Sequence, residues 1–431
     1  MTRERGNFTR LVVASGFSNL ADGVFQLALP LVALTITRDP GAFAAVTLVG
    51  RLPWLLFALP AGALADRLDR RRTMTLVNVG RVALIGALAV VVAADLQELW
   101  VLYLVAFGLG IGETMFDTAA QSILPNVVAD PSRLSKANGR LYAVELTGNQ
   151  FVGPALGGLI AAVSLAGALA SSAAAYAVAA VVLMLLVGRF RPTRVAAPQR
   201  LRADIAEGVR FLAGHRLLRT LALCVGISNL ASTAMFAVFP LFAVAPGPMG
   251  LSEAGFGLFL VALAAGSVLG SLFVATIERV LGRRGTLLLA TAMFPVFSLV
   301  PALTSSVPWI VATFFVAGAL MIGWNVVTVS LRQRIVPDHL LGRLNSCYRL
   351  LAWGTMPLGA AVGGVIGGRF GLEAVFWTST ALAALCVPIV YVVVTSDALA
   401  AAELPAIVTS STDTDGVSAA SGPHDGSVGG S

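Results

Sequence analysis

The sequence is poor in charge. Only 12% of its 431 residues are Asp, Glu, Lys or Arg, whereas 57% are hydrophobic, and the mean hydropathy is +0.86. A soluble domain carries roughly 25% charged residues, so a water-soluble globule of this size would lack polar surface. The composition therefore excludes an ordinary soluble protein and indicates a chain embedded in a lipid bilayer.

Residues suited to metal, redox or nucleotide chemistry are equally scarce. The three Cys lie in apolar stretches without a CxxC pair, as small buried hydrophobic residues do, and the three His form no cluster. The chain has no Walker motif, and its glycine-rich run at 108–112 lies in an apolar stretch without a preceding strand. We therefore predict no metal site, no cofactor and no catalytic residue.

The net charge of +7 is compatible with a nucleic-acid partner. However, the basic residues lie mainly in short loops between apolar stretches, which is the pattern of a membrane protein with its positive loops inside the cell. We expect the lipid bilayer, and no nucleic acid, to be the partner of these charges.

Long apolar stretches recur along the chain. A transmembrane helix needs about 20 mostly apolar residues, and twelve stretches meet that requirement. The sequence thus predicts an all-α integral membrane protein with twelve transmembrane helices. The predicted helices cover residues 10–37, 43–64, 74–94, 99–120, 138–161, 167–188, 216–244, 254–276, 286–304, 308–331, 342–366 and 372–396.

The most charged loop is Gly62–Arg72, which reads GALADRLDRRR. Clustered Arg marks the cytoplasmic side of a membrane. The Arg residues of the other loops fall almost entirely on the same side, and the opposite side holds only Arg38 and Arg369. We expect a multi-pass protein of a bacterial plasma membrane with both termini in the cytoplasm.

The two halves of the chain repeat each other. Ser18-Asn19-Leu20-Ala21 recurs 210 residues later, and Asp66, Arg67, Arg71 and Arg72 are matched 212 residues later by Glu278, Arg279, Arg283 and Arg284. The repeat predicts two six-helix bundles related by a pseudo-two-fold axis along the membrane normal, with the substrate site between them near the midplane. The predicted divisions are an N-terminal bundle at 1–188, a cytoplasmic linker with an amphipathic helix at 189–215, a C-terminal bundle at 216–396 and a disordered cytoplasmic tail at 397–431.

Two motifs resemble the major facilitator superfamily of secondary transporters. The charged loop is similar to its signature G-x-L-a-D-R-x-G-R-R, with Asp69 where the family prefers Gly. Residues Gly153–Gly158 (GPALGG) are similar to the G-P-x-x-G-G motif of proton-coupled antiporters, chiefly drug exporters. The stretch SNLADGVFQLALPL and the linker resemble the subgroup that contains macrolide-efflux proteins and the enterobactin exporter. Unlike many drug exporters, this chain has no Arg in its fourth predicted helix.

The resemblance implies a monomeric secondary transporter, not an enzyme. It would export a small amphipathic or drug-like molecule in exchange for protons, by alternating access. An importer, or a transporter of lipid, lysolipid or siderophore with the same fold, is the alternative within transport. A membrane receptor that does not transport is the alternative of another class.

Acidic residues inside the predicted helices are candidates for proton coupling, because ionisable groups in a bilayer are costly. Asp22 lies roughly 18 Å from the cytoplasmic end of its helix, near the midplane. Asn19 and Gln26 share its helix face, and Arg51 lies at a similar depth. One interpretation is that Asp22 pairs with Arg51 in one state and binds a proton in another; a permanent structural ion pair is the alternative. The proton-coupling candidates are Asp22, Glu113 and Glu145.

The charged loop is predicted to form a cytoplasmic gate. Asp117, nearer the surface than Glu113, is placed to receive Arg70 or Arg71 from the loop. The weaker copy of the loop in the second half lacks the Gly-x-Leu lead, so we expect it mainly to set topology. Solvated loop charges without a gating role are the alternative. The gate candidates are Gly62, Asp66, Arg67, Arg70, Arg71 and Asp117.

Amides and aromatic residues are the candidates for substrate contact, although the two Trp of the second half could equally be packing residues. The candidates for the substrate cavity are Asn19, Gln26, Arg51, Asn149, Asn229, Trp324, Asn325 and Trp353. Gly153 and Pro154 are predicted to kink their helix, and Gly157 and Gly158 to let a neighbouring helix approach closely, which would seal the cavity against ion leak.

Overall fold

The computed structural model describes residues 2–65, 68–128, 131–188, 190 and 201–401. These residues are almost entirely helical, as predicted. The first half contains α1 (Thr2–Ile36), α2 (Pro40–Ala65), α3 (Arg70–Ala93), α4 (Leu99–Val127), α5 (Pro131–Leu146), the π-helical turn η1 (Thr147–Val152), α6 (Gly153–Ala161) and α7 (Leu165–Met184). The second contains α8 (Leu201–Gly214), α9 (Arg216–Ala243), α10 (Glu253–Leu303), α11 (Val307–Ile335), α12 (Asp338–Phe370), α13 (Leu372–Val393) and α14 (Ser396–Ala401).

Ten helices within the described residues are long and apolar enough to cross a membrane. Two features separate this number from the predicted twelve. The eighth and ninth predicted helices run together as α10, which breaks at Gly282, where φ is 67° and ψ is 171°. This left-handed conformation suits a residue without Cβ. The fifth predicted helix is divided among α5, η1 and α6. All twelve apolar stretches are thus helical, while the number of membrane crossings stays a prediction.

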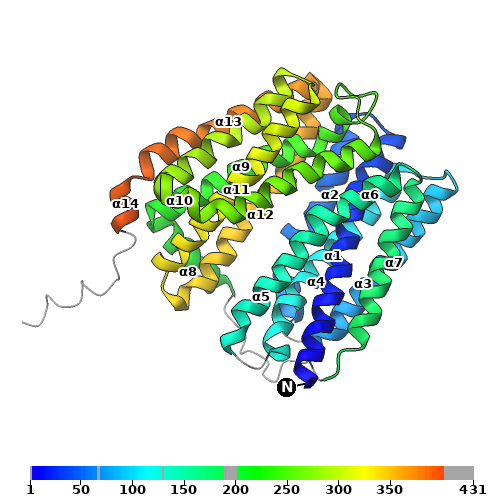
Figure 1. The fold of residues 1–431 in the computed structure, drawn as a ribbon, viewed down its shortest axis with the longest axis horizontal. Coiled ribbons are helices and arrows are strands. Elements are labelled where there is room, and N and C mark those ends of the chain that lie inside the picture. Colours follow the sequence, from blue (N-terminus) through cyan, green and yellow to red (C-terminus); the bar gives the residue numbers. More distant parts are fainter. Residues whose placement is uncertain (1, 66–67, 129–130, 189, 191–200, 402–431) are drawn as a thin grey trace, which may run out of the picture.

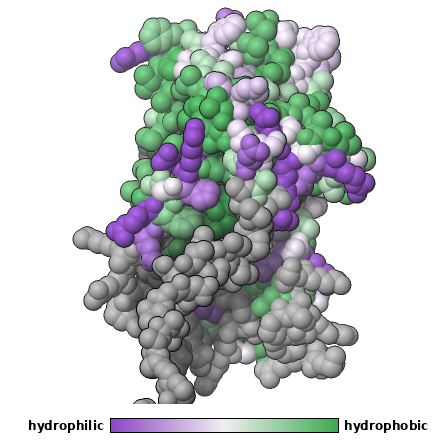
Figure 2. Space-filling view, turned by 90° about the vertical axis from the view of Figure 1, so that its left-hand side faces the viewer, coloured by the Kyte–Doolittle hydropathy of each residue, from purple (hydrophilic) through white to green (hydrophobic). Residues whose placement is uncertain are grey.

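The outer surface of the bundles is apolar. Large hydrophobic side chains such as Leu76, Val90, Leu272 and Phe273 are exposed. Figure 2 shows a broad hydrophobic area on the upper part of one face, with hydrophilic side chains gathered lower down. Apolar surface of this extent is stable against lipid and not against water. The chain is therefore a multi-pass membrane protein.

The helices gather into two bundles that lie side by side (Figure 1). We call α1–α7 the first half and α9–α13 the second half. Equivalent contacts recur in both: Gly157 of α6 packs on the backbone of Val24 in α1, and Gly363 of α12 packs on that of Ala234 in α9. Val24 and Ala234 are 210 residues apart, the offset of the sequence repeat. The pseudo-two-fold relation between the halves is confirmed by this pair of contacts.

The halves meet through small residues. A methyl group on Gly158 of α6 would lie 2.9 Å from Cα of Gly257 in α10, so the two backbones cross in close contact there. The pseudo-symmetric crossing lies between α12 and α2, where a methyl group on Gly364 would lie 3.4 Å from Cα of Gly41. Arg38, after α1, donates to the carbonyl oxygen of Ala245 at 2.9 Å. The halves are thus joined at the Arg38 end of the molecule.

The GPALGG motif begins where the helix changes its hydrogen-bond pattern. The N–H of Gly153 donates to the carbonyl oxygen of Gly148, five residues earlier, and Pro154 has no N–H to continue an α-helical ladder. The widened turn packs on α1: a methyl group on Gly23 would lie 2.6 Å from the carbonyl oxygen of Asn149. The motif therefore holds α1 and α10 on two sides of the same segment.

The linker helix α8 covers the start of the second half. Leu212 of this helix is buried in a cluster with Leu218, Leu344 and Tyr348. Val209, which lies three residues earlier on the same face, is exposed. The apolar face thus contacts α9 and α12 in addition to any membrane surface. The predicted tail begins with the short helix α14, and residues 402–431 lie outside the described range.

Candidate functional site

A buried ion pair stands at the centre of the first half. The Asp22 carboxylate of α1 lies 3.7 Å from the Arg81 guanidinium of α3 and accepts a hydrogen bond from the Tyr176 hydroxyl of α7. The side chain of Arg81 is only 2% exposed, and its guanidinium lies 5.0 Å from the ring centroid of Tyr176 and 5.4 Å from that of Phe116. We call Asp22, Arg81 and Tyr176 the Asp22 cluster. Both charges are desolvated, so each depends on the other for its stability.

Helix α4 leaves the room that Arg81 fills. A methyl group on Gly112 would lie 2.9 Å from Nε of Arg81, so a larger residue at this position would displace the guanidinium. The fourth predicted helix has no Arg, and the basic side chain that lies against it comes from α3 instead. Sequence reasoning did not identify Arg81 as the partner of Asp22. It also missed Tyr176, whose only signal was its isolation in an Ala-rich stretch.

In this conformation Arg51 pairs with Glu113 and not with Asp22, so the predicted pairing of Asp22 with Arg51 in one state stays a prediction. The Arg51 guanidinium lies 3.9 Å from the Glu113 carboxylate of α4. The reason is the order of the helices: α1 packs extensively on α7, and α2 packs on α4. Arg51 was predicted at a depth similar to that of Asp22, but in this conformation Arg81 is the arginine that pairs with Asp22.

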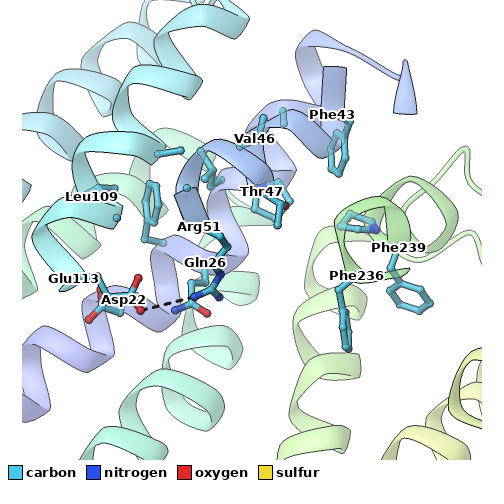
Figure 3. A pocket seen from close by; sticks show the side chains of 18 of the residues that line it. Asp22, Gln26, Phe43, Val46, Thr47, Arg51, Leu109, Glu113, Phe236 and Phe239 are labelled. Carbon is cyan, nitrogen blue, oxygen red and sulfur yellow. Dashed lines mark ion pairs between the residues drawn. The ribbon is translucent and has the colours of Figure 1, made fainter. Parts of the chain in front are cut away.

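The acidic residues border two connected cavities. The first, of about 280 Å³, is lined by Asp22, Arg51 and Glu113, and by Phe236 and Phe239 of α9. We call it the Asp22 cavity. Figure 3 shows Asp22, Gln26, Arg51 and Glu113 grouped together, with the two Phe across the cavity from them. Carboxylates of the first half and aromatic rings of the second therefore face one space.

The second cavity lies between the halves and has a volume of about 210 Å³. We call it the interface cavity. Its lining contains three acidic side chains and one basic side chain, so acidic groups outnumber basic ones there. Because Arg51 and Glu113 border both cavities, the two spaces adjoin. The interface cavity is lined by Arg51, Trp54, Glu113, Asp117, Glu145, Trp353 and Met356.

Two of the three predicted amides of the first half join α1 to η1, and the third bonds within its own helix. Gln26 donates to Oδ1 of Asn149 at 3.0 Å, which ties α1 to η1. Asn19 donates to the carbonyl oxygen of Ser15 in its own helix at 2.8 Å. Of these three, only Gln26 borders the Asp22 cavity.

The third cavity, of about 400 Å³, lies inside the second half, and we call it the C-half cavity. All four predicted substrate residues of this half border it, namely Asn229, Trp324, Asn325 and Trp353. The ring of Trp324 packs edge-on against Phe294, with centroids 5.6 Å apart. Trp353 packs edge-on against Trp54 of the first half, with centroids 4.5 Å apart. Trp353 thus contacts the other half and also borders both the C-half and interface cavities.

The predicted gate is only partly described. Asp66 and Arg67 lie outside the described residues, and Gly62 lies near the end of α2. Arg71 donates to the carbonyl oxygen of Leu186 at 2.7 Å, and the backbone N–H of Arg70 donates to that of Phe190 at 3.4 Å. The start of α3 is therefore tied to the end of α7. Asp117 borders the interface cavity. Arg71 donates to a backbone carbonyl in this conformation, and the contact of Asp117 with Arg70 or Arg71 stays a prediction.

Asp69 explains the one departure from the loop signature. Its side chain accepts a hydrogen bond from the backbone N–H of Arg72 at 3.0 Å and so caps α3. In the second half, Arg284 donates to the carbonyl oxygen of Val394 at 3.0 Å, which repeats the tie made by Arg71. Glu278 pairs with Arg283 at 2.8 Å, so the acid of the second loop is bound within its own loop.

Among the described residues, no group of three or more His, Cys, Asp or Glu side chains is placed to hold a metal ion. The acidic residues of the interface cavity face an arginine and two tryptophans across it. This arrangement suits an organic cation or a proton.

Comparison with known proteins decides the family. Residues 4–423 match a family of the major facilitator superfamily described as transmembrane secretion effectors. The chain belongs to this family. Major facilitator proteins are membrane transporters, so the helical halves, the pseudo-two-fold axis and the cavities between them are those of a transporter and not of an enzyme.

Named relatives and solved structures extend the likeness over nearly the whole chain. The multidrug efflux pump Tap of Mycolicibacterium fortuitum is 30% identical over 395 residues, which cover 86% of this chain and 92% of Tap. A bacterial homologue of the human lysosomal transporter Spinster, solved in an inward-facing and unoccupied conformation, superposes with a TM-score of 0.73 at 13% identity, over 94% of this chain and 99% of that one.

A bacterial homologue of the iron transporter ferroportin has been solved in two states. It superposes with a TM-score of 0.68 in its inward-facing state, at 17% identity, over 89% of this chain and 98% of that one. In its outward-facing state the TM-score is 0.57, at 16% identity and the same coverage. At these identities both solved structures bear on the fold alone.

Proposed function

We propose that this protein exports a small amphipathic or drug-like molecule in exchange for protons, by alternating access. The observation that carries the proposal is the position of Asp22 and Glu113, whose carboxylates border one cavity together with aromatic residues of the other half. The 30% identity to a multidrug efflux pump supports a drug-like cargo.

Exchange follows when a proton and a cationic cargo use the same carboxylates. Each desolvated carboxylate needs a neutralising partner, which is an arginine, a proton or the cargo. Arg81 serves Asp22 and Arg51 serves Glu113. Asp117 and Glu145 add two further acids to the interface cavity. A proton that neutralises one of these acids therefore lowers the affinity for a cation and promotes its release.

The conformation fits the cytoplasm-facing step of such a cycle. The halves are joined at the Arg38 end, through Arg38 and Ala245. The distribution of Arg predicts that this end is extracellular. The loop Gly62–Arg72 would then hold the cytoplasmic side closed in the opposite state.

Inside-out membrane vesicles with an acidic interior test the proposal. Vesicles that contain the protein should accumulate rhodamine 6G, a cationic dye, and an uncoupler should release it. Asp22→Asn should reduce accumulation to the level of vesicles without the protein. Asp95→Asn, in an exposed turn between α3 and α4, is the control and should leave accumulation unchanged. Accumulation that resists the uncoupler would rule out proton coupling.

A further inference from the structure

The C-half cavity contains two buried hydrogen-bond donors that the protein leaves unused. The indole Nε1 of Trp324 has no hydrogen-bond partner within the described part of the chain, and the hydroxyl of Tyr348 has none in normal hydrogen-bond geometry, although it lies near the side chain of Thr328. Their residues are only 5% and 7% exposed. They come from α11 and α12, and both border the cavity. Buried polar groups are almost always hydrogen-bonded, so the donors of Trp324 and Tyr348, which border the same cavity as the likewise unsatisfied hydroxyl of Ser228, require an explanation.

The chemistry of these groups specifies what would satisfy them. An indole N–H can only donate, so its partner must be an acceptor. Arg332 also borders the cavity, and its guanidinium lies 3.8 Å from the ring centroid of Tyr348. A cation over the ring draws electron density from the phenol and strengthens its O–H as a donor. The guanidinium itself contains donors and no acceptor. The polar lining at this place therefore favours a ligand that provides oxygen acceptors.

The rest of the lining is apolar and adaptable. Phe294 and Phe297 of α10 and Met293 and Met321 border the same space. Flexible Met side chains accommodate irregular apolar shapes and contact aromatic rings favourably. Such a lining suits a ring system and not an extended polar chain.

The C-half cavity also adjoins the interface cavity, because Trp353 and Met356 border both. Arg332 is the one charged residue among the described residues that line the C-half cavity, whereas the interface cavity holds three carboxylates. A ligand that reaches from one to the other meets donors at one end and negative charge at the other.

We propose that the C-half cavity binds the oxygen-bearing ring system of an amphipathic cation. Carbonyl, ester or ether oxygens of the ligand accept hydrogen bonds from Nε1 of Trp324 and the hydroxyl of Tyr348. The basic nitrogen of the same ligand faces the carboxylates of the interface cavity. The inference rests on the proposed function for the identification of this ligand as the exported cargo, but the binding itself needs no gradient.

Equilibrium binding to the purified protein in lipid nanodiscs tests the site. Two aromatic cations serve as probes: rhodamine 6G, which has an ester carbonyl, and ethidium, which has no oxygen. Trp324→Phe and Tyr348→Phe should each weaken rhodamine 6G about five- to tenfold, the effect of one lost hydrogen bond, and change ethidium binding by less than about twofold. Tyr348→Phe preserves the ring and its packing, so it tests the site even if Trp324→Phe folds poorly.

Matched controls repeat the same chemical changes outside the cavity. Trp309→Phe lies on the same helix as Trp324, at a residue that is 69% exposed, and Tyr391→Phe lies on α13, at a residue that is 60% exposed. Both should leave the binding of each dye unchanged.

Several results would overturn the assignment. They are an equal loss for both dyes, an equal loss in the control variants, no loss for rhodamine 6G in either cavity variant, or no binding of either dye by the unaltered protein. If the vesicles do not transport but the selective loss is observed, the export proposal fails and the binding site remains. If transport is proton-coupled but the cavity variants weaken both dyes equally, the binding-site proposal fails and the export proposal remains.

Discussion

The two halves share a scaffold but differ in what fills it. At the repeat offsets of 210 and 212, and with α7 and α13 aligned at their first residues, the three members of the Asp22 cluster have smaller or uncharged counterparts. All three counterparts border the C-half cavity. A packed ion pair in one half thus corresponds to open space in the other. The pairs are Asp22 and Ser232, Arg81 and Met293, and Tyr176 and Ala383.

The neighbouring positions show the same exchange. At the offset of 212, Gly112 corresponds to Trp324 and Glu113 to Asn325. Gly112 provides room for the Arg81 guanidinium, whereas Trp324 places an indole donor in the cavity. A duplicated bundle can therefore keep its helix contacts while one copy fills a position with a buried ion pair and the other leaves a cavity there.

The largest effect should come from the acid that has no counterpart in the second half. Asp22→Asn should abolish uncoupler-sensitive dye accumulation, because the amide cannot exchange a proton. Ser232→Ala at the matching position should change the rate by less than about twofold, since its hydroxyl bonds only to its own helix. Rates in inside-out vesicles measure both. Similar losses at the two positions would contradict the conclusion that proton coupling depends on the first half alone.

The next effect concerns stability. Arg81→Met removes the partner of a buried carboxylate and should lower the free energy of unfolding by about 3–5 kcal/mol. The double variant Asp22→Ser/Arg81→Met copies the second half and should regain most of that loss, without regaining transport. Thermal unfolding of the purified variants measures it. If the double variant is as unstable as Arg81→Met, the unpaired Asp22 carboxylate is not the cause of the lost stability.

A smaller difference in stability is expected between variants at the two helix crossings that join the halves. Gly158→Val would press a side chain into the backbone of Gly257 and should cost about 1–3 kcal/mol. Gly364→Val meets the side chain of Ala44 at 3.0 Å and the backbone of Gly41 only at 3.4 Å, so it should cost less. Unfolding temperature and transport rate should fall in the same order. The reverse order would show that the α12–α2 crossing is the tighter one.

The smallest effect concerns the loops. Asp66→Ala should slow export roughly threefold, the scale expected for the loss of one charge from the predicted gate loop, without preventing membrane insertion. Glu278→Ala should cost less, because Glu278 pairs within its own loop. Initial transport rates, normalised to the protein present in the membrane, test this. Equal losses would remove the asymmetry between the loops.

The fold was largely predictable because hydropathy and Arg placement report directly on membrane burial. The apolar stretches, the repeat and the GPALGG packing segment all follow from local composition or spacing. Breaks within helices were harder to predict. The turn at Gly282 is too short to interrupt an apolar pattern clearly, and η1 depends on where Pro154 removes a hydrogen bond.

The site was predictable in its residues and not in its pairings. Asp22, Glu113 and Trp324 were identified from their cost or rarity in a membrane. Which arginine reaches which acid depends on helix rotation and on neighbours such as Gly112, and a single sequence does not specify these.

The crossing of Gly158 and Gly257 has a mechanical consequence. Bare backbones in contact offer little side-chain interlock, so the two helices can roll over each other as on a fulcrum. From this point the helical segment runs back to Pro131, a distance of about 40 Å, so a tilt of about 10° swings its far end by about 7 Å. A rigid tilt of this long segment, without deformation of the helices, would then open a gap wide enough for a bulky cargo to enter.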